Sequence, residues 1–160
     1  MIKKMGRVIK MDKLAILGQR CKTDMEVLDF AADYLYENGY VHESFREALK
    51  ERERTYPTGL PTTPYGVAIP HTFPEHVKKE AVLTITLEKP VPFREMGAIT
   101  DSFVDICCLF VLLLVEEQKQ INMLPKLMKL IQDADTIAAI VQSQSQDEVS
   151  KLISGYLNIS

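Results

Sequence analysis

The feature that most constrains the fold is an almost uninterrupted apolar run from Val104 to Val115. Several of its residues are β-branched or aromatic, which is typical of a β-strand that is buried on both faces. Its longest unbroken stretch, Ile106 to Val115, is far shorter than the roughly 18 residues that a membrane-spanning helix needs, and Asp105 and Glu116 bracket it. We therefore predict a central strand of a sheet, and no insertion of this chain into a membrane.

Amphipathic segments on both sides of this strand predict the helices that cover it. Apolar residues recur at helical spacing over 25–38, 43–54, 118–132, 136–142 and 146–157. The expected N-caps are Thr23 or Asp24, Ser44 in a capping box with Glu47, Asp135 and Ser145.

The strand pattern is weaker elsewhere in the chain. Alternation at period two predicts a strand over 81–88 with one buried face, which Pro90 and Pro92 should end. Residues 56–64 are rich in proline and threonine and are predicted to form a loop. The order of helices, then strands, then helices predicts a sheet between two helical layers.

Length and charge limit the organisation and the partners. We predict a single domain over 1–160, because neither half of the chain is long enough to build a good core alone. The 22 acidic and 19 basic residues give a net charge of -3, which argues against nucleic acid as a partner. The start of the chain lacks the apolar segment of a signal peptide, so we expect a cytoplasmic protein with reduced cysteines.

A histidine directly follows a short apolar segment in the sequence Gly-Val-Ala-Ile-Pro-His at 66–71. Pro70 fixes its own φ and biases Ile69 towards an extended backbone, so the segment should be a strand whose end determines the place of the His71 ring. A nucleophile or a metal ligand requires such placement. The alternative is that His71 only caps the strand by hydrogen-bonding a backbone carbonyl.

Other chemistries of histidine fit the sequence poorly. A metal pair of His71 and His76 lacks a convincing third ligand, since Glu75 is the only acid between them. No G-x-S-x-G elbow and no phosphate-binding or dinucleotide glycine motif is present, so no metal and no cofactor is expected. A neutral imidazole can itself attack a phosphoryl group, hold it as a phosphoramidate and pass it on. His76 could assist if residues 72–76 curl back, or could point into solvent.

Three short motifs in a fixed order resemble a known family. They are Arg52-Glu53 at a helix end, Pro-Thr-Gly-Leu at 57–60, and the 66–71 segment. Together they are similar to the enzyme IIA domains of the mannitol–fructose type (type 2) in the bacterial phosphoenolpyruvate-dependent sugar phosphotransferase system (PTS). The similarity extends over most of the chain. It implies an α/β fold in which a mixed β-sheet is flanked by helices on both faces.

The resemblance also implies a phosphotransferase reaction. His71 would accept phosphate from phospho-HPr and donate it to a cysteine of an enzyme IIB, which phosphorylates the sugar entering through the membrane component enzyme IIC. Arg52 matches the arginine that supports the phosphohistidine. It is the expected exception in the charged run 50–54, whose other residues are predicted to be solvated.

One position departs from the mannitol-type pattern. Gln120 stands where those members carry a second active-site histidine, and an amide can hydrogen-bond a phosphoryl oxygen but cannot become a cation. The chain therefore resembles galactitol-type IIA proteins more than mannitol-type ones. The alternative is a regulatory, nitrogen-type IIA module, in which phosphorylation of His71 changes the affinity for a partner protein.

Overall fold

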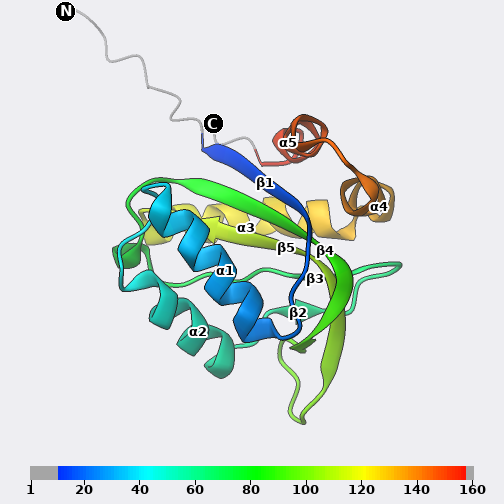
Figure 1. Cartoon of the computed structure of the whole chain (residues 1–160), viewed down its shortest axis with the longest axis horizontal. Helices are drawn as coiled ribbons and strands as arrows, with labels where there is room; N and C mark the ends of the chain where they lie inside the picture. The colour runs from blue at the N-terminus through cyan, green and yellow to red at the C-terminus, as the bar shows by residue number, and fades with distance from the viewer. Residues whose placement is uncertain (1–10, 158–160) are drawn as a thin grey trace, which may run out of the picture.

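A five-stranded sheet forms the middle of the molecule, with the strand order β1-β4-β5-β3-β2 (Figure 1). The computed structural model describes residues 11–157, so residues 1–10 and 158–160 of the predicted domain lie outside it. The strands are β1 (Asp12–Gln19), β2 (Gly59–Leu60), β3 (Gly66–Ala68), β4 (Ala81–Arg94) and β5 (Phe103–Leu113). β1 pairs with β4 and β3 with β5 in parallel, while the β2–β3 and β4–β5 pairs are antiparallel. The sheet is therefore mixed, as the resemblance implies.

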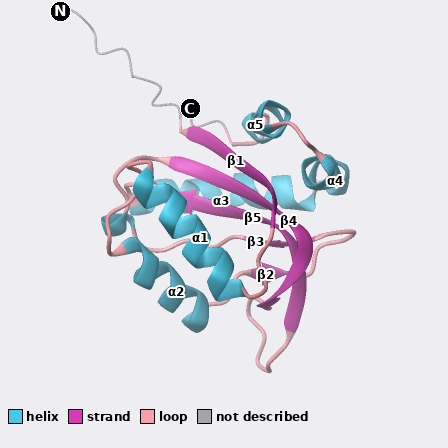
Figure 2. Cartoon of the chain, viewed as in Figure 1, coloured by secondary structure: helices cyan, strands magenta, loops and turns pink. Residues whose placement is uncertain are grey.

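Helices cover both faces of this sheet (Figure 2). Helices α1 (Asp24–Glu37) and α2 (Phe45–Thr55) lie on one face, and α3 (Glu117–Gln132), α4 (Ala134–Gln142) and α5 (Gln146–Ser154) lie on the other. A short 3-10 turn, η1 (Pro74–His76), follows β3. The predicted arrangement of a sheet between helical layers is confirmed. No helix within residues 11–157 is both long and apolar enough to cross a bilayer.

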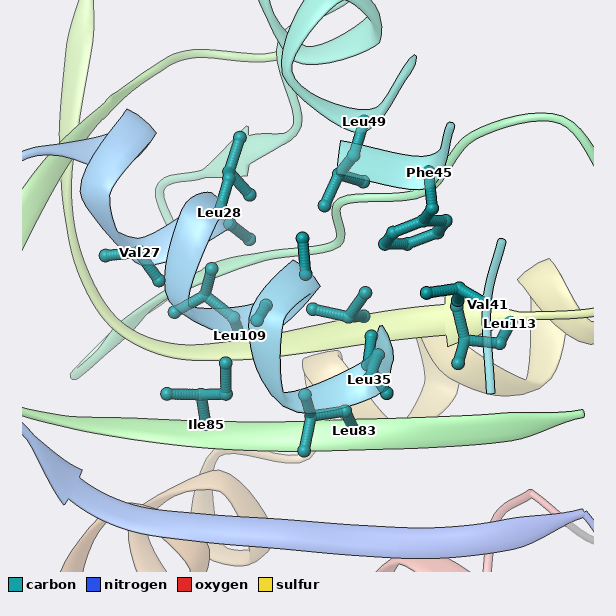
Figure 3. Close-up of a cluster of buried hydrophobic side chains, with 14 of the residues drawn as sticks. Val27, Leu28, Leu35, Val41, Phe45, Leu49, Leu83, Ile85, Leu109 and Leu113 are labelled. Carbon is teal, nitrogen blue, oxygen red and sulfur yellow. The ribbon is translucent and has the colours of Figure 1, made fainter. Parts of the chain in front are cut away.

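Each face of the sheet has its own hydrophobic core. Figure 3 shows the core under α1 and α2, where helix side chains meet those of β4 and β5; its members include Val27, Leu28, Leu35, Phe45, Leu49, Leu83, Ile85 and Leu109. The second core joins Val82, Phe110 and Leu112 to helices α3, α4 and α5. Residues 81–87 are all buried. The prediction of one buried face for β4 is therefore wrong, because helices cover this strand on both sides.

The two prolines do not end β4, contrary to the prediction. The strand continues to Arg94, with a register shift against β5 between Thr86 and Val91 and renewed pairing from Val91 through Pro92 to Arg94. β1 pairs with β4 only as far as Leu87, so beyond that residue one side of β4 is a free edge. Prolines are tolerated at bulges and at strand edges, where no ladder N–H is required of them.

Helix caps were predicted with mixed success. Thr23 Oγ1 accepts a hydrogen bond from Glu26 N at the start of α1, and Ser145 caps α5 in the same way, as predicted. The capping box at α2 is wrong, because Ser44 has helical dihedrals and makes no side-chain cap bond. The cap of α4 is Asp133, not Asp135.

The edge strand β1 was not predicted from the sequence. Helix α5 packs beside it and supplies hydrogen bonds to its outer edge. Gln146 Nε2 donates to Ala15 O (2.7 Å), and Ser150 Oγ donates to Lys13 O (3.2 Å). Side chains of α5 thus satisfy carbonyls of β1 that point away from β4.

The strands β2 and β3 place the segment that ends in His71. β2 forms within the predicted proline-rich loop, as a two-residue strand at the edge of the sheet. Gly66 at the start of β3 lies so close to β5 that an added Cβ would be 2.3 Å from Asp105 O. Only glycine allows β3 to pack against β5 in this register.

Candidate functional site

His71 follows the end of β3 and is fixed by one backbone hydrogen bond. Its Nδ1 donates to Ile69 O over 2.9 Å. A carbonyl oxygen only accepts hydrogen bonds, so Nδ1 must carry the proton. In the neutral ring the lone pair is therefore on Nε2, which is the nitrogen available as a nucleophile.

The surroundings of His71 favour this neutral ring. Burial lowers the pKa of His71 below its ordinary value of 6.5, and the positive charge of Arg52 lowers it further, although the hydrogen bond to Ile69 acts in the opposite direction. A ring with a lowered pKa keeps its Nε2 lone pair at neutral pH.

One cavity brings together three of the four residues singled out in the sequence. The His71 cavity has a volume of about 170 Å³ and is lined by Arg52, His71, Thr72, Phe73, Leu112, Glu117, Gln120, Ile121 and Leu124. A neighbouring hollow of about 330 Å³ shares Arg52, Thr72 and Phe73 with it and also includes Tyr56. An arginine, a histidine and a glutamine from separate segments of the chain therefore face one small space.

Arg52 comes from the last turn of α2, and two aromatic rings hold its guanidinium. Its Cζ lies 4.4 Å from the centroid of the Tyr56 ring and 5.5 Å from that of Phe73. Both rings are more than half exposed. Cation–π contacts of this kind orient a planar guanidinium and leave its N–H groups able to bind an anion.

Gln120 lies on the first turn of α3. Its Nε2 donates to Thr72 O over 3.0 Å, which ties the helix to the residue after His71. α3 begins at Glu117, and the first N–H groups of a helix have no partner within it. The start of α3 therefore adds partial positive charge beside the His71 cavity.

His76 is not among the residues that line the His71 cavity. It lies in η1, where its Nδ1 is hydrogen-bonded with Ser44 Oγ (2.8 Å) and its Nε2 is 3.9 Å from Glu75 Oε1. Residues 72–76 turn the ring towards the start of α2, which accounts for its absence from the cavity. The structure thus brings Arg52, His71 and Gln120 together without His76.

Glu53 is buried, so the prediction that it is solvated is wrong. Only 4% of it is exposed, and its carboxylate accepts hydrogen bonds from Thr58 N (2.7 Å) and Thr58 Oγ1 (2.8 Å). Burial raises the pKa of Glu53 to about 7, against the two hydrogen bonds from Thr58. The helical spacing could have indicated this burial, because Glu53 lies on the same face of α2 as the buried Phe45 and Leu49, four residues from each to the next.

The shifted pKa values of Glu53 and His71 make the free energy of unfolding depend on pH in opposite directions. The folded pKa of Glu53, about 7, lies above its ordinary value of 4.5, so its contribution is full below pH 4.5 and is lost as the pH rises through 7. The lowered pKa of His71 makes its contribution full above pH 6.5 and lost at more acidic pH. In wild type, the Glu53 contribution should make the free energy of unfolding fall by about 1 to 3 kcal/mol between pH 5.5 and pH 8. We expect Glu53→Gln to lack this part of the fall. Urea titrations at the two pH values, with exposed Glu47→Gln as the control, measure this, and equal slopes for Glu53→Gln and wild type would contradict it.

Within residues 11–157, His, Cys, Asp and Glu side chains form no group of three or more that could hold a metal ion. The chemistry that the arrangement supports uses an imidazole nucleophile beside a guanidinium. An unprotonated Nε2 can accept a phosphoryl group, and arginine is the side chain whose donors match two phosphoryl oxygens.

Comparisons with known proteins point in the same direction. The family model "Phosphoenolpyruvate-dependent sugar phosphotransferase system, EIIA 2" matches residues 8–156. The galactitol-specific EIIA component of Escherichia coli K12 is 28% identical over 116 residues, which are 72% of this chain and 76% of that protein. The mannitol-specific EIICBA component of the same organism is 28% identical over 142 residues, 87% of this chain and 21% of that longer protein.

A solved structure shows the same fold. The complex of mannitol enzyme IIA with phosphorylated mannitol enzyme IIB from Escherichia coli contains a chain that superposes on this one with a TM-score of 0.69. The two chains are 26% identical, and the match covers 88% of this chain and 94% of the other. The mixed sheet flanked by helices is thus shared with a mannitol-type IIA protein.

Proposed function

The chain belongs to the EIIA 2 family of the phosphoenolpyruvate-dependent sugar phosphotransferase system, and on that premise we propose that His71 is its phosphoryl acceptor and donor. A protein of this family acts in phosphoryl transfer for sugar uptake. The observation that carries the proposal is the placement of the His71 ring, with its lone pair on Nε2, in one cavity with the Arg52 guanidinium.

The first transfer would begin with phospho-HPr docked over the His71 cavity. The Nε2 lone pair attacks phosphorus, the P–N bond to the HPr histidine breaks, and a new P–N bond forms to His71. The proton stays on Nδ1, hydrogen-bonded to Ile69 O, throughout the transfer, so the ring enters the reaction in the correct tautomer. No metal or cofactor is needed to balance this exchange.

The negative charge of the moving phosphoryl group needs donors around the cavity. The Arg52 guanidinium is the permanent cation there, and the start of α3 and the amide of Gln120 add N–H groups. Gln120 supplies no charge of its own. We therefore assign most of the electrostatic stabilisation to Arg52.

The second transfer would pass the group to a cysteine of an enzyme IIB. The thiolate attacks phosphorus, the P–N bond to His71 breaks and a P–S bond forms. The solved complex of a mannitol enzyme IIA with its phosphorylated enzyme IIB supports a IIB partner. Three exposed apolar side chains beside the cavity, Tyr56, Phe73 and Ile121, offer both partners a docking rim. We place this relay in the cytoplasm, with enzyme IIC as its membrane component.

The sugar we propose is galactitol or a closely related sugar alcohol. The support is the 28% identity to a galactitol-specific EIIA component over most of both chains, together with Gln120 at the departure from the mannitol pattern. A IIA protein contacts phosphate and protein partners, so its own cavity carries no contact with the sugar.

A two-step labelling experiment tests the relay against a regulatory module. The chain is incubated with radiolabelled phospho-HPr and then with galactitol enzyme IIB. We expect acid-labile label on His71 that moves on to the enzyme IIB cysteine within seconds to minutes. Label that stays on His71 with galactitol, mannitol and fructose enzymes IIB alike would instead support the regulatory role.

A further inference from the structure

Hydrogen bonds on both sides of the Ile69 backbone link the buried carboxylate of Glu53 to the ring of His71. Thr58 N and Oγ1 both donate to Glu53, and Thr58 Oγ1 in turn accepts from Ile69 N over 3.3 Å. Ile69 O accepts from His71 Nδ1 over 2.9 Å. The path thus runs from α2 through the loop before β2 to the end of β3.

Each step of this path restricts the next one. The Thr58 hydroxyl donates its hydrogen bond to the Glu53 carboxylate, so the hydroxyl oxygen is oriented to accept the hydrogen bond from Ile69 N. Ile69 is held on its other side as well, because Leu112 N on β5 donates to Pro70 O (3.3 Å). Pro70 has no N–H and a fixed φ, so few backbone movements remain for Ile69 O.

Glu53 is also the chain neighbour of Arg52. The carboxylate that holds Thr58 therefore fixes the last turn of α2, from which Arg52 reaches the His71 cavity. A buried carboxylate is a costly way to join a helix to a loop, since well-packed apolar residues are often at least as stable. Its presence at this helix end fits a role in geometry better than a role in stability.

We propose that Glu53 and Thr58 are positioning residues for phosphoryl transfer, which fix the orientation and the tautomer of the His71 ring relative to Arg52. This inference rests on the proposed function of His71. Neither residue touches the phosphoryl group. Both act through the backbone of Ile69, whose N–H is bonded to Thr58 and whose carbonyl is bonded to His71.

Thr58→Val against Thr58→Ser is the sharpest test. Valine keeps the shape and the backbone N–H of Thr58 but removes the hydroxyl, whereas serine retains the hydroxyl. We expect Thr58→Val to lower kcat for transfer from phospho-HPr by about 10- to 100-fold, the usual effect of a small misplacement of a reacting group, with KM for phospho-HPr nearly unchanged. Thr58→Ser should keep a kcat within about threefold of wild type.

The tautomer of His71 gives a readout that a general loss of stability would not move. In nitrogen-15 NMR spectra we expect the His71 ring of wild type and Thr58→Ser to be protonated at Nδ1, and that of Thr58→Val to populate both tautomers. Thr62→Val is the matched control, because it also removes a threonine hydroxyl from this loop. The Thr62 hydroxyl donates to Tyr65 O and takes no part in the path to His71. Its kcat and ring tautomer should match wild type.

The outcomes separate this inference from the proposed function. A wild-type chain that takes no phosphate from phospho-HPr would overturn both. An active wild type together with a Thr58→Val variant of unchanged kcat and unchanged tautomer would overturn only the positioning role, and so would an equal loss in Thr58→Ser. If Thr58→Val does not fold, Glu53→Gln against Glu47→Gln makes the same comparison, since Gln offers one acceptor oxygen to two donors. Equal kcat in that pair would also refute the inference.

Discussion

His71→Ala is expected to accept no phosphate from phospho-HPr while it keeps its fold. The substitution removes the Nε2 lone pair, and no other histidine lines the cavity that contains Arg52. The ring is half-buried and is hydrogen-bonded to Ile69 O, so the loss of packing should be modest. Acid-labile phosphate on the protein measures acceptance, and thermal unfolding checks the fold.

His76→Ala is the matched control for this experiment. His76 is close to His71 in sequence but is hydrogen-bonded with Ser44, away from the cavity. We expect this variant to label as wild type does. Label on His71→Ala, or its loss in His76→Ala with an intact fold, would refute the assignment of the phosphorylated residue.

Arg52→Ala is expected to slow phosphoryl transfer by orders of magnitude. The guanidinium is the permanent cation that lines the His71 cavity, and removal of an arginine that stabilises a transferring phosphoryl group in other enzymes costs about 10³- to 10⁵-fold in rate. Arg52→Lys should recover part of the rate, because an ammonium keeps the charge but lacks the planar fork and its stacking on Tyr56 and Phe73. Rapid-mixing kinetics with phospho-HPr provides the measurement.

Arg54→Ala is the control on the same helix end. Arg54 is exposed and pairs with Glu51, and it does not line the cavity. Its rate should stay within about twofold of wild type. A loss of less than about tenfold in Arg52→Ala, equivalent to roughly 1.4 kcal/mol, would show that Arg52 is surface charge rather than part of the reaction.

The layer architecture follows from the sequence because it depends on local patterns. The apolar run at 104–115 can be buried only inside a covered sheet, and the helices show their apolar faces at regular spacing. β1 has no such signal, since it becomes a strand by pairing with β4. The continuation of β4 past Pro90 also could not be predicted from the sequence, because a proline is tolerated there only where β1 no longer pairs with β4.

The site was predictable to the extent that it lies in contiguous motifs. The motifs that contain His71 and Arg52 suggest both residues, and the structure places the two side chains around one cavity. The sequence does not show that Glu53 turns inward to Thr58, because a charged helix end is usually solvated. His76 shows the converse error, in which a residue is expected at the site because it is close to His71 in sequence. Its ring lies outside the cavity and is hydrogen-bonded with Ser44.

The contact between α5 and β1 bears on self-association. A strand at the border of a sheet offers unpaired carbonyls to any passing chain, and such borders are where proteins stack into larger aggregates. Here Gln146 and Ser150 occupy the carbonyls of Ala15 and Lys13. Helix α5 therefore covers the outer edge of β1, and its two side-chain hydrogen bonds oppose the addition of a strand from another molecule along that edge.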